Sequence, residues 1–199
     1  KIPISIIMID TQGKLLVAPP GMSDWRFQKT VVYVWRHDVS GAAGVIINKK
    51  CTHPTFQHVC EEGVIKRKDE IKPPIHYGGP VLNNIIGVLH SKDYMLGSSN
   101  TDKKQELAFT LDRKMLEIIA KGEGPKQKIV TLGIANWEAN QLEEELIADP
   151  PRTKNMSWLV IPYNEEIVFG DNNQDLWEMC VSKAVENKTK EITSKVFRS

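Results

Sequence analysis

Short apolar runs separated by turn residues predict strands in the first part of the chain. Leu15 to Ala18 is apolar and ends at two prolines, as a buried strand does. Thr30 to Trp35 is rich in β-branched and aromatic residues, and Val45 to Ile47 follows a turn marked by Gly41 and Gly44. The close spacing of the second and third runs predicts an antiparallel hairpin.

Strands and helices alternate irregularly along the rest of the chain. Further strands are predicted over Ile75 to Tyr77, Ile85 to Leu89, Leu107 to Leu111, Ile129 to Ile134 and Trp158 to Ile161. Helices are predicted over Pro54 to Glu62, from Asp112 to Gly122, over Glu138 to Ile147, and through Leu176, Cys180 and Ala184. Exposed loops are expected over Ile65 to Pro74 and Tyr94 to Lys104. This pattern favours an α+β fold, with a curved, partly closed sheet and helices packed outside.

Length and composition fit one domain over residues 1–199. Of the 199 residues, 41% are hydrophobic and 26% are charged, which is typical of a soluble globular protein. The net charge of +1 gives no basic field of the kind that holds DNA through its phosphates. No apolar run approaches the ~20 residues of a membrane-spanning helix. The run Ile2 to Ile9 lacks the features of a signal peptide, and the three cysteines are irregularly spaced, so we expect a cytoplasmic protein.

Motifs of common enzyme and metal-binding classes do not occur in the chain. A P-loop, a dinucleotide-binding fingerprint and a nucleophile elbow are all missing. Cys51, His53, His58 and Cys60 are residue types that bind zinc, but the spacing C-x-H-x4-H-x-C is not one that zinc sites use. Cys60 also fits the apolar face of the helix over Pro54 to Glu62. We therefore expect no metal site and no cofactor.

His37 and His90 are candidates for acid–base chemistry because the ordinary pKa of histidine lies near neutrality. His37 precedes Asp38, and His90 precedes Ser91. Neighbours on a strand point to opposite faces, so neither histidine is expected to bond the side chain that follows it. Each would need a partner distant in the sequence. The alternative for each is a structural histidine held by hydrogen bonds.

Polar residues around one predicted strand–helix junction are candidates to line a cleft. Gln141 and Glu143 lie at the edge of the buried face of the helix over Glu138 to Ile147, and Trp137 is expected to start this helix as a core residue or a pocket wall. The turn Gly78-Gly79-Pro80 is expected to set the register of the next strand and to aim His90 at the cleft. The candidate cleft residues are His37, Gly79, Pro80, His90, Asn136, Trp137, Gln141 and Glu143.

Many glycines, prolines and aromatic residues occur in a recognisable order between residues 13 and 184. They are Gly13 to Met22, Asp24, Phe27, Val31 to Tyr33, His37, Gly41, Gly44, Asn48, Gly78 to Val81, Gly87 to Ser91, Gly122 to Pro125, Gly133, Trp137, Gln141 to Glu143, Trp158 to Val160, and Ile167 to Phe169. In order and spacing this set resembles the AlgH/YqgE family. An N-terminal extension and a charged C-terminal tail lie outside the match.

The resemblance implies a bulged, mostly antiparallel, open-barrel-like sheet with helices packed outside, in a mainly bacterial and cytoplasmic setting. It implies no established activity, although one label within the family suggests transcriptional regulation. The chain departs from the family pattern at Asn136, where glycine is common, and at Gly21, where serine is usual. The segment from Cys51 to Cys60 is not a family feature.

Two classes of function remain open at this stage. A non-enzymatic regulatory or protein-interaction domain fits landmarks that are mostly glycines, prolines and core residues. A cryptic enzyme or small-ligand-binding protein requires polar side chains to converge in a cleft. We expect the first class, with an unknown protein partner, an indirect link at most to transcription, no specific binding of duplex DNA by the chain alone, and no membrane association.

Overall fold

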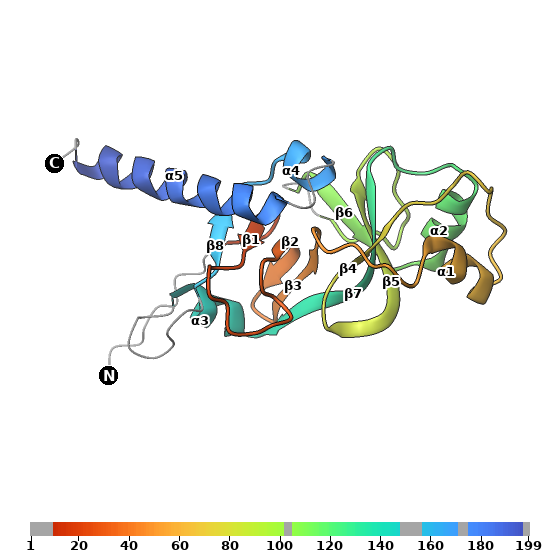
Figure 1. Ribbon diagram of the computed structural model, residues 1–199, viewed down its shortest axis with the longest axis horizontal. Coiled ribbons are helices and arrows are strands. Elements are labelled where there is room, and N and C mark those ends of the chain that lie inside the picture. Colours follow the sequence, from red (N-terminus) through yellow and green to blue (C-terminus); the bar gives the residue numbers. More distant parts are fainter. Residues whose placement is uncertain (1–9, 102–104, 148–156, 171–174, 197–199) are drawn as a thin grey trace.

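Eight strands and five helices make up the described part of the protein in a computed structural model that covers residues 10–101, 105–147, 157–170 and 175–196 (Figure 1). The strands are β1 (Leu15–Val17), β2 (Val31–Asp38), β3 (Gly41–Ile46), β4 (Ile75–Tyr77), β5 (Val81–Ser91), β6 (Leu107–Thr110), β7 (Lys128–Glu138) and β8 (Leu159–Ile161). The helices are α1 (Phe56–Glu62), α2 (Arg113–Ala120), α3 (Gln141–Ile147), α4 (Glu165–Phe169) and α5 (Leu176–Val196). The run Ile2 to Ile9 and part of the loop predicted over Tyr94 to Lys104 lie outside the described residues.

The strands form one open, mostly antiparallel sheet, which confirms the predicted fold class. The strand order is β6-β5-β7-β3-β2-β1-β8, and β4 adds a parallel pairing to β7. The strand β7 is central because its first part pairs with β5 and β4 while its end pairs with β3. Register shifts between Val34 and Arg36 in β2, and between Val81 and Ile86 in β5, bulge the sheet.

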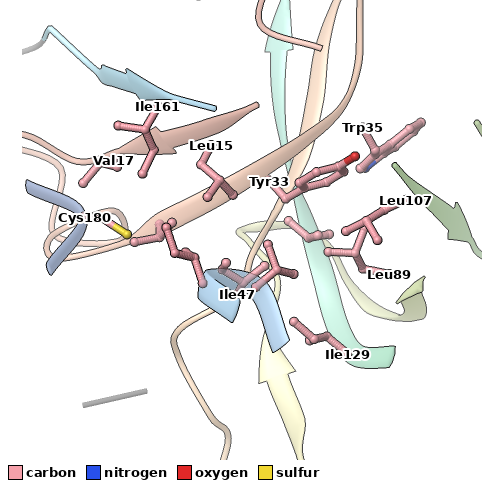
Figure 2. Close-up of a cluster of buried hydrophobic side chains, with 14 of the residues drawn as sticks. Leu15, Val17, Tyr33, Trp35, Ile47, Leu89, Leu107, Ile129, Ile161 and Cys180 are labelled. Atoms are coloured by element: carbon pink, nitrogen blue, oxygen red, sulfur yellow. The ribbon is translucent and has the colours of Figure 1, made fainter. Parts of the chain in front are cut away.

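Helices cover the sheet over three apolar clusters. The helices α4 and α5 pack on the largest cluster, where Cys180 lies with Leu15, Val17 and Ile161 (Figure 2). The helices α1 and α2 cover the cluster around Phe56 at the other end of the sheet. The third cluster contains Leu142 of α3 and Trp158, which directly precedes β8. The helix α5 continues past the sheet (Figure 1). Among the described residues, none of the helices combines the length and the apolar character that a membrane span requires.

Several element boundaries follow the expected local signals. Asp112 is the N-cap of α2, and its carboxylate accepts a hydrogen bond from Lys114 N at 2.9 Å. Gly122, with φ of +77°, follows the end of that helix as predicted. Thr55 caps α1, so Pro54 precedes the cap instead of occupying the first turn. The predicted hairpin of β2 and β3 is present.

The junction between β7 and α3 differs from the prediction. The strand β7 runs to Glu138, so Trp137 is a strand residue and α3 begins only at Gln141. The reason is a tertiary pairing, because residues Ala135 to Glu138 form a ladder with Gly41 to Gly44 of β3. The short helix α4, capped by Asn164, was not predicted, because its five residues are too few to show a helical period.

Three glycines let the connection between β4 and β5 cross the middle of β7. A Cβ atom on Gly78 would lie 2.2 Å from Gly133 O, and one on Gly79 would lie 2.2 Å from the carbonyl carbon of Ile134. Gly79 and Gly133 also have φ of +151° and +76°, which L side chains rarely adopt. The crossing places Gly78 N 2.8 Å from Leu132 O, and Ile46 N 2.9 Å from Gly78 O. Backbone therefore packs directly on backbone at the centre of the sheet.

The substitution Gly79→Val is expected to lower the free energy of unfolding by at least about 1–3 kcal/mol, because it adds a clash with β7 to a strained φ. Gly97→Val is the matched control, since a Cβ atom there meets nothing within 4 Å, and it should change stability by no more than ~0.5 kcal/mol. Urea denaturation of both variants makes the measurement. A Gly79→Val protein as stable as the control would contradict the proposed crossing constraint.

Candidate functional site

A hollow of about 160 Å³ opens where the loop before β2, the start of β5, the end of β7, α3 and the start of β8 meet. We call it the tryptophan hollow. Its lining residues are Met22, Asp24, Arg26, Phe27, Pro80, Val81, Asn136, Trp137, Gln141, Glu145 and Trp158. The glycine crossing positions one side of this hollow, because Pro80 and Val81 directly follow Gly79 while Asn136 and Trp137 follow Gly133 on β7.

Three aromatic rings form the apolar wall of the tryptophan hollow. The ring centroids of Trp137 and Trp158 are 6.0 Å apart, and Phe27 lies 6.3 Å from Trp137 and 5.7 Å from Trp158. Two of these contacts are edge-to-face, the geometry that aromatic quadrupoles favour. Both tryptophans are buried against the cluster under α3, so the wall is held in place by packing.

The carboxylate of Glu145 joins the two tryptophans. Its Oε2 accepts hydrogen bonds from the indole N–H groups of Trp137 at 3.0 Å and Trp158 at 2.7 Å. Its Oε1 accepts a third from Gln141 Nε2 at 3.0 Å, one turn away on α3. These three bonds link α3 to β7 and to Trp158, which directly precedes β8.

An ion pair between Asp24 and Arg26 also lines the hollow. Arg26 donates to Asp24 from Nε at 2.9 Å and from Nη2 at 2.6 Å. These bonds to the Arg26 guanidinium lower the pKa of the Asp24 carboxyl below its usual value. Asp24 is therefore ionised at neutral pH, and its negative charge pairs with the Arg26 guanidinium.

Behind α3, His37 and Glu143 form a buried pair that does not line the tryptophan hollow. His37 Nε2 lies 3.0 Å from Glu143 Oε1. The backbone N–H of Thr11 donates to His37 Nδ1 at 3.3 Å, so Nδ1 is an acceptor and the proton on Nε2 points to Glu143. The pair connects β2 to α3. Glu143 is thus the partner distant in the sequence that His37 was expected to need.

His90 lies away from the hollow and is fully buried, with 0% of its surface exposed. Its Nδ1 lies 2.8 Å from the Ser91 carbonyl oxygen, which can only accept, so Nδ1 carries a proton. Its Nε2 lies 2.9 Å from Thr110 Oγ1, which also bonds Ser99 Oγ at 2.7 Å. The Gly78-Gly79-Pro80 turn was expected to aim His90 at the cleft. In the structure, Pro80 of this turn lines the tryptophan hollow and His90 does not.

As expected, neither histidine bonds the side chain that follows it. The Ser91 hydroxyl pairs with Asp93, and the Asp38 carboxylate pairs with Ser40.

Of the eight predicted cleft residues, the structure brings Pro80, Asn136, Trp137 and Gln141 together at the tryptophan hollow. Gly79 lies beneath it in the crossing. His37, Glu143 and His90 lie elsewhere, in buried hydrogen-bonded positions. The hollow also contains residues that the sequence analysis missed: Met22, Asp24, Arg26, Phe27, Val81, Glu145 and Trp158. Because Gln141 and Glu145 are four residues apart on one helix, their spacing in the sequence could have identified Glu145 as a residue of the site.

The cysteine–histidine segment has structural contacts of its own. Cys60 is buried in the cluster under α1, which confirms its predicted place in the core. His58 Nδ1 lies 2.6 Å from Thr55 Oγ1 in the helix cap, and the rings of His53 and His58 are 4.6 Å apart. Across the residues that the structure describes, no group of three or more His, Cys, Asp or Glu side chains is placed to hold a metal ion.

The fold and the hollow define an open-sheet α+β domain with an aromatic recess rimmed by paired polar groups. The chain belongs to the AlgH-like family, DUF179, whose model matches residues 15–188. This confirms the resemblance drawn from the ordered landmarks.

Relatives and solved structures agree with this family assignment. A UPF0301 protein of Bradyrhizobium sp. is 34% identical over 179 residues, covering 86% of this chain and 80% of that protein. One of Gluconobacter oxydans is 36% identical over 172 residues, covering 85% and 88%. The solution structure of the AlgH protein from Pseudomonas aeruginosa matches with a TM-score of 0.67 and 30% identity over 87% of each chain. A crystal structure of a Corynebacterium diphtheriae protein shares the fold, with a TM-score of 0.59, 18% identity and 84% coverage of each chain.

The substitution Glu145→Ala is expected to lower the free energy of unfolding by about 1–3 kcal/mol, because it leaves two buried indole N–H groups without their acceptor. Glu144→Ala is the control, because Glu144 is the exposed residue directly before Glu145 on α3, and it should change stability by ~0.5 kcal/mol or less. Equal effects of the two substitutions in urea denaturation would show that the indole–carboxylate contacts contribute nothing.

Stability is expected to fall as the pH drops through about 6.5, because burial lowers the pKa of His90 from that value in the folded protein. The unfolded chain then binds a proton that the folded protein does not, so acid favours unfolding. In His90→Gln this part of the pH dependence should vanish. Unfolding free energies measured at intervals between pH 5 and pH 8 give the slope, and an unchanged slope in the variant would contradict this assignment.

Proposed function

We propose that this protein is a non-enzymatic interaction domain that holds a short segment of a partner protein at the tryptophan hollow. The observation that carries the proposal is the pairing of the charged groups there. Asp24 holds Arg26, and Glu145 accepts from two indoles and from Gln141. A catalytic base or nucleophile must be free to take a proton or to attack. Groups fixed by one another suit recognition better than catalysis.

The size of the tryptophan hollow supports a protein segment as its occupant. Its volume of about 160 Å³ is below the ~300 Å³ at which small-molecule pockets commonly begin. A recess of that size suits one or two side chains of a longer segment. Aromatic anchors in a desolvated recess are also typical centres of protein interfaces.

The rim of the hollow offers both polar and apolar contacts to such a segment. The exposed amide of Asn136 carries a donor and an acceptor that match a peptide backbone. Beside it, Val81 and Leu82 at the start of β5 are 40% and 43% exposed, although both are apolar. Exposed apolar side chains next to an aromatic recess provide area that a partner would bury.

The proposal includes a cytoplasmic setting and a regulatory role exerted through the partner. The near-neutral net charge supports a protein partner over duplex DNA, because DNA binding draws most of its affinity from phosphate neutralisation. Any link to transcription is then indirect.

Site-specific photo-crosslinking tests the proposal. A photoreactive amino acid at Val81 should yield one defined protein adduct in cells that carry the protein natively. The same amino acid at Val64, which is 88% exposed in the turn after α1, is the matched control and should yield none. Asn136→Arg should remove the Val81 adduct by filling the hollow with a charged side chain.

Adducts that are identical at Val81 and Val64, or absent from both, would refute the proposed partner site. A metabolite whose thermal stabilisation of the protein disappears in Asn136→Arg would instead support the small-ligand alternative.

A further inference from the structure

A larger hollow of about 470 Å³ lies on the other side of the loop that precedes β2. We call it the lysine hollow. Its lining residues are Pro19, Pro20, Gly21, Met22, Trp25, Gln28, Lys29, Lys49 and Trp177. Met22 lines both hollows, but the lysine hollow differs in size, in charge and in the elements that build it. It joins the loop before β2 to the chain just after β3 and to the first turn of α5.

Two indoles give the lysine hollow flat aromatic surfaces. Trp177 is fixed, because its Nε1–H donates to Ala18 O at 2.8 Å. Trp25 is 77% exposed, which leaves one of the largest apolar side chains mostly in water. An indole in this position is available to stack on a ligand ring.

The charges around the lysine hollow do not balance. Lys29 Nζ lies 5.3 Å from the centre of the Trp177 ring and 3.4 Å from Glu178 Oε1, so one carboxylate offsets this lysine. Lys49 Nζ donates to the carbonyl oxygen of Arg26 at 3.2 Å, and no carboxylate of the described ranges forms an ion pair with it. Burial also lowers the pKa of the Lys49 ammonium, which reflects the cost of keeping its charge away from water.

We propose that the lysine hollow binds a small molecule that combines a flat aromatic ring with one anionic group, a phosphate or a carboxylate. The anion pairs with Lys49, and the ring lies against the exposed indole of Trp25. The volume falls within the ~300–1,000 Å³ of small-molecule sites, unlike that of the tryptophan hollow. A single anion balances the one uncompensated lysine, and charge-assisted bonds are among the strongest that a ligand can form.

Isothermal titration calorimetry on the full chain tests the ligand class. The probes are adenosine 5′-monophosphate and 2-naphthoate, which carry a phosphate and a carboxylate on a flat ring system. Adenosine and inorganic phosphate each supply half of the required chemistry. We expect saturable binding of at least one ringed anion at one site per chain. Adenosine and inorganic phosphate should each bind about tenfold or more weakly than the nucleotide, since stacking on one aromatic ring contributes ~1–3 kcal/mol.

Variants then assign the binding to the lysine hollow. Lys49→Ala and Trp25→Ala should each weaken binding by about tenfold, whereas Lys49→Arg should retain it. The control Lys50→Ala removes the exposed neighbouring lysine and should leave affinity unchanged. Because Trp25 is mostly exposed, its removal should not disturb folding, which circular dichroism checks. Asn136→Arg, which blocks the tryptophan hollow, should also leave binding intact, so this inference and the proposed partner site can fail separately.

Three results would overturn the inference. The first is that neither ringed anion binds. The second is that binding survives both Lys49→Ala and Trp25→Ala, and the third is that inorganic phosphate alone binds as tightly as the nucleotide. Binding of an acidic peptide when both small probes fail would likewise assign the hollow to a macromolecule and reject a small-molecule ligand.

Discussion

The crossing of Gly78 and Gly79 over β7 is the contact on which the rest of the structure depends. Two backbones approach so closely that no Cβ atom fits between them, and Gly133 supplies the matching space on β7. This approach lets the chain between β4 and β5 bond both Leu132 on β7 and Ile46 on β3. These bonds add to the pairing of β7 itself, which already links β5 and β4 to β3. The same crossing places the start of β5 beside the end of β7 along one side of the tryptophan hollow.

The helix α3 is held by buried polar contacts as much as by apolar area. Leu142 is fully buried, while Glu143 bonds His37 on one side of the helix and Glu145 bonds two indoles. Hydrogen bonds of this kind are directional, so they specify the position of the helix more narrowly than apolar packing alone does. A helix of seven residues could not hold its place through intrinsic propensity.

The two hollows differ in the state of their charges, and this difference separates the roles that we propose for them. Around the tryptophan hollow, the charges of Asp24 and Arg26 cancel and the carboxylate of Glu145 accepts three hydrogen bonds from neutral donors. In the lysine hollow, Lys49 has only a carbonyl oxygen as its acceptor among the described residues. A recess whose charged groups already have several hydrogen-bond partners favours a largely neutral segment, whereas a partly buried ammonium with a single acceptor favours an anion. One loop, from Pro19 to Lys29, contributes to both recesses.

Local signals in the sequence were sufficient for the fold class, the family and most of the elements. The apolar run at Leu15 ends at two prolines, and Asp112 caps a helix, because both signals act within a few residues of where they are read. The candidate site was determined only in part. Trp137 and Gln141 could be recognised beside each other in sequence, but Phe27 and Trp158 reach Trp137 only through tertiary packing. His37 and His90 looked equivalent in the sequence, and only the tertiary structure showed that both are buried in separate hydrogen-bonded positions. The physical reason is that burial, charge pairing and the extension of β7 to Glu138 depend on residues distant along the chain, and local patterns carry no information about these neighbours.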